Sequence, residues 1–465
     1  MNSKSLYTIF ISALISWTTN GQDTTATSIT QYGITWNFSE EHQVGKFING
    51  DYYVIAPESG IQIQSVSPKP ENNKNGSMLN PQVGGTQGYD NSILNYDTND
   101  TLNFPTVVLA GNSLVSTVSL TDSDQKNGYY YPTWNSDRIS KSQAALKTAA
   151  VLTILAEAPP KDSFRPPLVG KNKKIYRFSD IGMSILPKLP SPLITGDKIE
   201  YLSRGLERPW LTHLSGWTCR RMHPIENMKN YHEYVGMFLS EASSLALTDK
   251  ATDDFLIRYI QMGIDMYHTS TEGYGDSSFF KWPVIFTGLL LNDESMQNVF
   301  IEDRNKTPGR TEKLFYFWKD KKSTIESKIV PPGQTYSGET VFFRKQIGNS
   351  EYEHLHPSEW HLADNGGGGK SERYRHCCDS HPHIGMILCA QILNKTELWN
   401  DDAAIAYADR WMNEKPEEFL PLIEEADYSI TPSSGNTGSN FISDMWLLYR
   451  HTEPPENPSN LETVN

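Results

Sequence analysis

Cysteine is scarce in this chain of 465 residues, which contains four: Cys219, Cys377, Cys378 and Cys389. So low a count, with two of the cysteines adjacent, excludes a disulfide-rich scaffold. A disulfide between Cys219 and the 377/378 pair and a set of buried thiols are both compatible with the spacing. Cys378 and Cys389 are not expected to pair along one helix.

Positive charge is also in short supply, because 41 Lys and Arg residues stand against 55 Asp and Glu residues and the net charge is −14. This excess of negative charge argues against nucleic-acid binding and against long-range attraction of a polyanionic substrate. An enzyme that acts on an acidic polymer would therefore need a locally basic cleft within an acidic body.

Long apolar runs are missing beyond the N-terminus. The run Leu6–Trp17 is about a dozen residues long, whereas a membrane-spanning helix needs about 20. The run is preceded by a lysine and followed by small residues, which predicts a secretory signal peptide over residues 1–21 with cleavage near Gln22. We therefore expect a periplasmic or secreted protein without a membrane span.

Residues 28–160 contain short apolar or alternating segments separated by Gly, Pro, Asn and Asp, which predicts a β-sandwich-like domain. Strands are expected at residues 34–38, 52–55, 61–66, 106–109, 114–120 and 150–155. Residues 68–103 are interpreted as a polar insertion in this domain. Residues 161–198 are interpreted as an extended, proline-rich connector.

Residues 199–455 show helical spacing of apolar side chains. Helices are expected at residues 230–247, 253–269, 282–291, near Gln297, and at 383–393, 401–413 and 441–449. Successive helices joined by loops with Trp, His, Tyr and Arg predict an α/α barrel, or toroid, with a cleft at one rim. The expected fold class is α+β multidomain: a β-sandwich-like domain and then the toroid. No fixed-period repeat is visible, so a solenoid is disfavoured.

The stretch Trp217–Tyr234, WTCRRMHPIENMKNYHEY, is the densest group of proton-transferring and anion-binding side chains in the chain. It starts in a loop and continues into a predicted helix. The candidate catalytic residues in it are Arg221, His223, Asn227 and Tyr231. A salt-bridged helix start is the structural alternative, since ionisable groups also cluster without function.

Three other polar stretches supply candidate substrate-binding residues. A glycine-rich approach to a helix ends in Lys281-Trp-Pro and lacks the spacing of a phosphate-binding loop. Residues 353–361 include His354 and Trp360. Residues 372–383 include Tyr374 and Arg375.

Histidines in the last two stretches raise the alternative of a zinc site, because the two rings of a His-x-His pair on a strand point to one face. The histidines concerned are His354, His356, His361, His381 and His383. The spacing specifies no complete ligand set, so no metal or other cofactor is predicted.

The residue types in these stretches suit β-elimination on a uronic acid. The proton at C5 becomes acidic once Arg, Asn or His neutralises the adjacent carboxylate. A Tyr or His then removes the proton, and a Tyr or His protonates the group that leaves C4. No nucleophile elbow, Walker loop or dinucleotide motif competes. Hydrolysis by two carboxylates would draw on Glu226, Glu353, Glu359 and Asp379, but the sequence does not give their separation.

Several motifs together carry a resemblance to a known family: GITWNF at 33–38, GKFINGDY at 45–52, FRPP at 164–167, RMHPIENM at 221–228, KWP at 281–283 and YRHCC at 374–378. The chain resembles a secreted marine bacterial family of polysaccharide-lyase-like α/α-barrel proteins, and is most similar to flavobacterial ulvan oligosaccharide dehydratases. The resemblance implies elimination of water from C4 of a non-reducing-end glucuronate or iduronate, which leaves a 4,5-unsaturated uronyl end. Such analogy suggests a function and assigns no residue its role.

On this interpretation His223 and Tyr231 transfer protons, and Arg221 with Asn227 neutralises the carboxylate. The predicted pocket is completed by Lys281, His354, Tyr374 and Arg375, with Trp217 and Trp360 stacking on sugar rings. The expected partner is an anionic oligosaccharide or polysaccharide. Two alternatives stay open: a depolymerising lyase for ulvan, glucuronan or alginate, and a non-catalytic glycan-binding protein.

Overall fold

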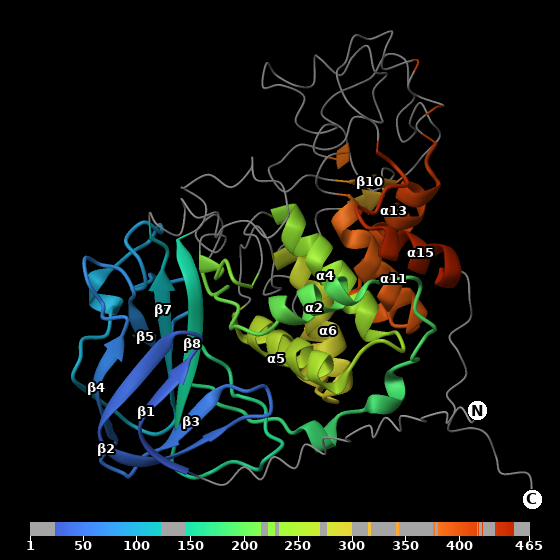
Figure 1. Ribbon diagram of the computed structural model, residues 1–465. Coiled ribbons are helices and arrows are strands. Elements are labelled where there is room, and N and C mark those ends of the chain that lie inside the picture. The colour runs from blue at the N-terminus through green and yellow to red at the C-terminus, as the bar shows by residue number, and fades with distance from the viewer. Residues whose placement is uncertain are drawn as a thin grey trace, which may run out of the picture.

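A computed structural model describes residues 24–121, 145–214, 222–227, 232–269, 277–299, 315–317, 341–343, 375–376, 380–415, 417, 421 and 433–450. Within these residues, an N-terminal curled β-sheet is followed by a helical region, and the two lie side by side (Figure 1). The predicted α+β organisation is confirmed.

Eight strands form the N-terminal sheet: β1 Thr24–Gln31, β2 Ile34–Lys46, β3 Tyr52–Ile55, β4 Ile61–Ser67, β5 Ser77–Leu79, β6 Thr106–Val108, β7 Asn112–Ser119 and β8 Leu146–Leu155. Their order is β5-β7-β8-β3-β2-β4-β6, with β1 beside β2. The pair β3–β8 is parallel, and the other pairs are antiparallel.

The sheet curls around an apolar core. In β4 the buried Ile61 and Ile63 alternate with exposed residues, as expected for a strand with one face turned to a core. The buried Trp36 of β2 donates from Nε1 to Ser116 Oγ of β7 at 3.0 Å. Because β8 and β3 lie between these strands in the sheet, only strong curvature brings the two side chains together.

The predicted sandwich is therefore corrected to one curled mixed sheet, a half-barrel. The parallel β3–β8 pair joins strands β5-β7-β8 and strands β3-β2-β4-β6 into one sheet. In a sandwich, two separate sheets would stack face to face. The predicted polar insertion at 68–103 also contains β5, which was not predicted.

The helical region contains nine α-helices in its described part: α2 Gly196–Gly205, α4 His232–Ala246, α5 Asp253–Thr269, α6 Lys281–Leu290, α7 Glu294–Gln297, α11 Ile384–Ile392, α12 Thr396–Trp399, α13 Asp402–Asn413 and α15 Asn440–Tyr449. Short 3-10 helices lie at η1 Thr98–Asp100, η3 Phe178–Asp180, η4 Met183–Ile185, η5 Ser277–Phe280 and η10 His381–His383. Strands β9 Phe315–Phe317 and β10 Val341–Phe343 pair antiparallel. Each predicted helical segment contains a helix, but no closed toroid is seen among these elements.

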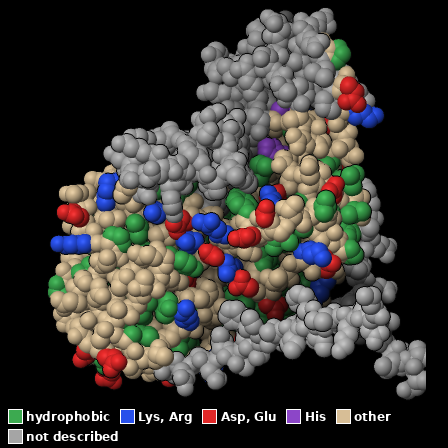
Figure 2. Space-filling model, viewed as in Figure 1, with side chains coloured by type: hydrophobic (Ala, Val, Ile, Leu, Met, Phe, Trp, Pro, Cys, Tyr) green, Lys and Arg blue, Asp and Glu red, His purple; other side chains and the backbone are tan. Residues whose placement is uncertain are grey.

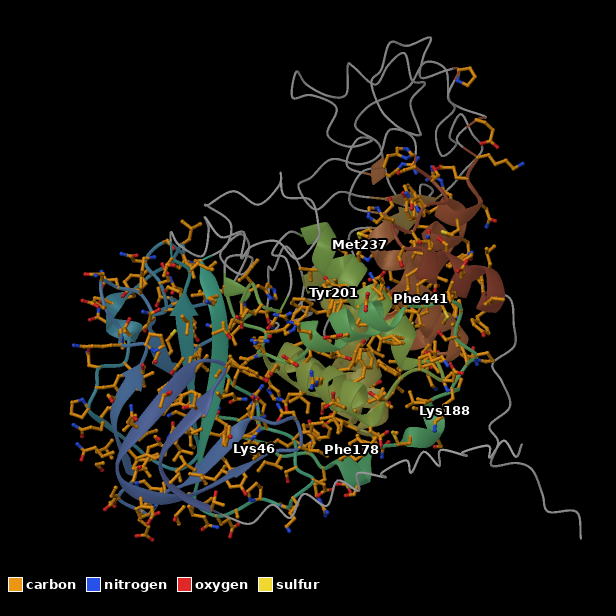
Figure 3. The ribbon with its side chains drawn as sticks, viewed as in Figure 1. Lys46, Phe178, Lys188, Tyr201, Met237 and Phe441 are labelled. Carbon is orange, nitrogen blue, oxygen red and sulfur yellow. The ribbon has the colours of Figure 1, made fainter. Side chains whose placement is uncertain are left out.

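Helix α4 is central to this region and packs against α2, α5, α6, α11 and α15. Its buried side chains include Phe238, whose ring meets Tyr201 of α2 edge-on at 5.9 Å. Figure 3 labels Met237 on α4, Tyr201 on α2 and Phe441 on α15. Fully burying an aromatic or aliphatic side chain contributes about 1.5–3 kcal/mol, so this core stabilises α4 and the helices that pack against it.

Strand β8 is buried on both faces because its second face packs on the helical region. Ala149 and Val151 of β8 share an apolar cluster with Leu211, Leu214 and Met222. A strand of the sheet thus packs against the segment that carries the first candidate stretch.

None of the helices in the described part of the chain is long and apolar enough to cross a bilayer.

Candidate functional site

Four of the ten candidate site residues lie in the described part of the chain: His223, Asn227, Lys281 and Arg375. The other six lie outside the described residues: Trp217, Arg221, Tyr231, His354, Trp360 and Tyr374. The geometry of the site is therefore built from the four and from their neighbours.

Ring contacts join the first candidate stretch to the second. The His223 ring meets Trp210 edge-on, with centroids 4.9 Å apart. Trp210 in turn contacts Phe280, with centroids 6.4 Å apart, and Phe280 directly precedes Lys281 at the start of α6. His223 and Phe280, which are more than fifty positions apart in the sequence, are thereby linked through Trp210.

The stretch at 372–383 reaches the same end of α4. The His383 ring lies 4.9 Å from Phe279, and Ser240 of α4 donates from Oγ to the Pro382 carbonyl oxygen at 2.5 Å. Gly236 makes this approach feasible, since a Cβ there would lie 2.6 Å from both Phe279 and Pro382. Three of the four polar stretches therefore meet at the N-terminal half of α4, the end labelled by Met237 in Figure 3.

All four described candidates are buried, with at most 3% of each residue exposed. The ammonium of Lys281 lies 5.4 Å from the centroid of the Trp399 ring, a cation–π arrangement that partly compensates for lost hydration. These groups therefore do not face bulk solvent in this structure.

The turn at 222–227, which carries His223 and Asn227, is fixed by Arg208. The side-chain nitrogen Nδ2 of Asn227 donates to the Arg208 carbonyl oxygen at 3.0 Å, and Arg208 Nη2 lies 2.8 Å from Glu226 Oε2. The Arg208 guanidinium also lies over the Tyr32 ring at 4.4 Å. Arg208 thus ties the turn to the first hairpin of the sheet.

Backbone contacts add a second tie between this turn and the sheet. The Ile225 amide donates to the Leu146 carbonyl oxygen at 3.0 Å, where β8 begins. Figure 2 shows charged side chains of both signs where the sheet meets the helices. The sheet therefore positions the candidate turn, a function that the sequence did not predict for it.

Arg375 holds its own segment in place. Its guanidinium makes two contacts with the Glu414 carboxylate, at 3.0 and 3.2 Å, and a third with the Tyr407 hydroxyl at 3.3 Å. Burial would raise the pKa of Glu414, but the charges of Arg375 and Arg410 hold it below its ordinary value. Since paired guanidinium and carboxylate groups satisfy one another, this geometry gives Arg375 a supporting position.

The neighbouring His376 is kept neutral. Burial, assisted by the positive charge of Arg375, lowers the pKa of His376 well below its ordinary value. Its Nδ1 accepts a hydrogen bond from the Ser433 amide at 3.1 Å, so the neutral ring carries its proton on Nε2. His376 was not a sequence candidate, although it follows Arg375 directly.

The sequence also missed a buried ion cluster between the sheet and the helices. Arg165 Nε lies 2.5 Å from Asp51 Oδ2, and its Nη1 lies 3.1 Å from Asp265 Oδ1 on α5. All three side chains are at most 2% exposed. Burial raises the pKa of Asp265, and Arg165 opposes the rise. The connector motif at 164–167 thus joins the two regions electrostatically.

Lys173 extends this cluster toward β7. Its Nζ donates to the Pro167 carbonyl oxygen at 2.8 Å and to Ser113 Oγ at 3.0 Å. Burial, together with the charge of Arg165, lowers the pKa of Lys173 to about 7. Burial also lowers the pKa of His268, near Lys173, to about 4. Perturbed groups of this kind mark functional sites or structural ion-pair networks.

Within the described residues, no group of three or more His, Cys, Asp or Glu side chains is arranged to hold a metal ion. Of the histidines considered for zinc, His354, His356 and His361 lie outside those residues, and His381 and His383 lie in η10. Cys389 is a buried thiol whose pKa burial raises to about 12, and it forms no disulfide.

Comparison with known proteins finds no family model, no curated protein and no solved structure that matches this chain significantly. The resemblance noted in the motifs therefore remains a prediction, and functional inference rests on the residues and their geometry.

Proposed function

We propose that the protein is a carbon–oxygen lyase that acts on uronic-acid-containing oligosaccharides of the ulvan type. The reaction eliminates water at a non-reducing-end glucuronate or iduronate. A base takes the proton from C5, hydroxide leaves C4 and is protonated as it departs, and a 4,5-unsaturated uronyl end remains. The protein would act in the periplasm or after secretion, once a signal peptide is removed near Gln22.

The observation that carries the proposal is the meeting of three polar stretches at the N-terminal half of α4. Elimination requires a base, an acid and a positive or hydrogen-bonding group around one sugar ring, all held in a defined geometry. His223, Lys281 and the segment before α11 come from distant parts of the sequence, and ring contacts link them through Trp210 and Phe279–Phe280. A merely solvated helix start needs no such convergence.

Proton transfer is assigned to His223 and Tyr231, and neutralisation of the carboxylate to Arg221 and Asn227. The amide nitrogen of Asn227 carries two hydrogens. One of them binds the Arg208 carbonyl oxygen, which would orient the second. A partly dry environment strengthens hydrogen bonds to a carboxylate, and the burial of Asn227 supports this role.

The remaining candidates would complete the pocket around the sugar. Lys281, His354 and Tyr374 would bind substrate, with Trp217 and Trp360 against the sugar faces, while Arg375 would support the segment through Glu414. We also propose that the helical region closes into an α/α toroid. The packing of α4 against α5, α6 and α11 supports this architecture.

The direct test is to incubate the purified protein with ulvan oligosaccharides that have saturated ends. Ultraviolet absorbance follows the conjugated uronate, and mass spectrometry follows the chain length. Rising absorbance with loss of one water at constant chain length is the expected result. Rising absorbance with shorter chains would make the protein a depolymerising lyase. Binding without any rise on ulvan, glucuronan or alginate fragments would indicate a glycan-binding protein.

A further inference from the structure

Two polar rings meet inside the apolar cluster between the sheet and the helical region. Tyr89 belongs to the chain between β5 and η1, and His213 lies in the segment after α2. Their ring centroids are 5.9 Å apart with the planes nearly perpendicular. Both residues are completely buried, at 0% exposure.

Neither ring has a hydrogen-bond partner for its polar atoms among the residues that the structure describes. These atoms are the Tyr89 hydroxyl oxygen and both ring nitrogens of His213. Folded proteins satisfy nearly all buried polar groups, and each orphan costs about as much as a lost hydrogen bond. Three such atoms on two rings in contact therefore require an explanation.

Apolar side chains pack around the pair in the part of the chain that the structure describes. The described cluster around the pair is apolar and includes Met78, Leu211 and Met222. Burial lowers the pKa of His213 to about 3 and raises the pKa of Tyr89 well above its ordinary value, so both are neutral near pH 7. A neutral imidazole offers one donor and one acceptor, and a phenol offers a donor and an acceptor. Their natural complement is a small neutral molecule that both donates and accepts.

We infer that Tyr89 and His213 bind a buried water molecule that bridges the phenol and the imidazole. Buried waters typically make about three hydrogen bonds to polar groups that otherwise lack partners. The bridge would add to the backbone bond from the Gly84 amide to the His213 carbonyl oxygen at 2.8 Å. It would thus help to fix the segment that leads toward the candidate turn. This inference does not depend on the lyase proposal.

Matched substitutions of tyrosine test the bridge. Tyr259→Phe is the reference variant, because the Tyr259 hydroxyl is also buried and has a visible partner, Ser243 Oγ at 2.7 Å. Tyr89→Phe is expected to lower the melting temperature by at least as much as Tyr259→Phe, since it removes one end of the bridge. An unchanged or higher melting temperature for Tyr89→Phe would overturn the inference, because deleting an orphan hydroxyl relieves a cost.

A double-mutant cycle and a crystal structure complete the test. His213→Phe combined with Tyr89→Phe should lower the melting temperature by less than the sum of the two single losses, since both act through one water. A high-resolution crystal structure of the unmodified protein should show a single water within hydrogen-bonding distance of both rings. An additive cycle, a direct Tyr89–His213 hydrogen bond or electron density larger than one water would each contradict the inference.

Discussion

The junction between the sheet and the helices and the N-terminal half of α4 are both buried, yet distant segments are joined in different ways. At the junction, Arg165 binds two carboxylates that come from a sheet loop and from α5. At α4, ring contacts and the close approach at Gly236 bring the segments together. The junction should therefore be sensitive to changes of charge, and the α4 end to changes of volume.

Removing the arginine at the junction should have the largest effect. Arg165→Ala leaves Asp51 and Asp265 buried without a countercharge, and loss of one partner from a buried pair costs about 3–5 kcal/mol. The free energy of unfolding from urea titration measures this loss. Arg177→Ala in the same connector is the control, because Arg177 is 47% exposed in its pair with Asp162 and exposed ion pairs contribute little to stability. Equal losses of unfolding free energy in the two variants would show that the buried Arg165 pairs contribute no more than an exposed ion pair.

Adding one methyl group at α4 should have the next largest effect. Gly236→Ala places a Cβ 2.6 Å from Phe279 and Pro382, and overpacking of this kind costs about 1–3 kcal/mol. Gly196→Ala is the control, because a Cβ at the start of α2 meets nothing within 4 Å. Thermal unfolding compares the two variants. If Gly236→Ala is as stable as Gly196→Ala, close packing does not hold the segments together.

A third predicted effect concerns pH at the junction. The pKa of Lys173 falls from 10.5 to about 7 on folding, so between these values the unfolded chain binds more protons than the folded one. Stability from this group therefore rises with pH from about 7 to 10. We expect the rise in unfolding free energy over that range to be smaller in Lys173→Met than in the unmodified protein, because methionine cannot titrate. Parallel pH profiles would contradict the assignment.

The helices could be predicted from the sequence because helical periodicity is local. The predicted span of 253–269 coincides with α5, and other ends differ by a few residues. Helix α2 was missed: it is short and has glycine at both ends. The parallel pairing of β3 with β8 also could not be predicted, since strand periodicity gives no partner and about a hundred residues separate the two strands.

In the candidate site, too, local patterns could be predicted from the sequence and long-range contacts could not. Clustering of residue types along the sequence selected His223 and Lys281 as candidates, and the structure links their stretches through Trp210. No sequence signal could identify the Arg165 pairs, because 114 and 100 positions separate Arg165 from Asp51 and Asp265. The sequence also could not show that Arg375 is buried and paired with Glu414, because 39 positions separate the two residues.

The most direct test of the central claim compares two histidine variants in the elimination assay. His223→Gln should abolish the formation of unsaturated uronate because it removes the proposed proton-transfer group at α4. His42→Gln changes a buried histidine of β2 in the same way and should keep most of the activity. If unsaturated uronate forms at the same rate in both variants, His223 does not transfer the proton and the α4 site is not where elimination occurs.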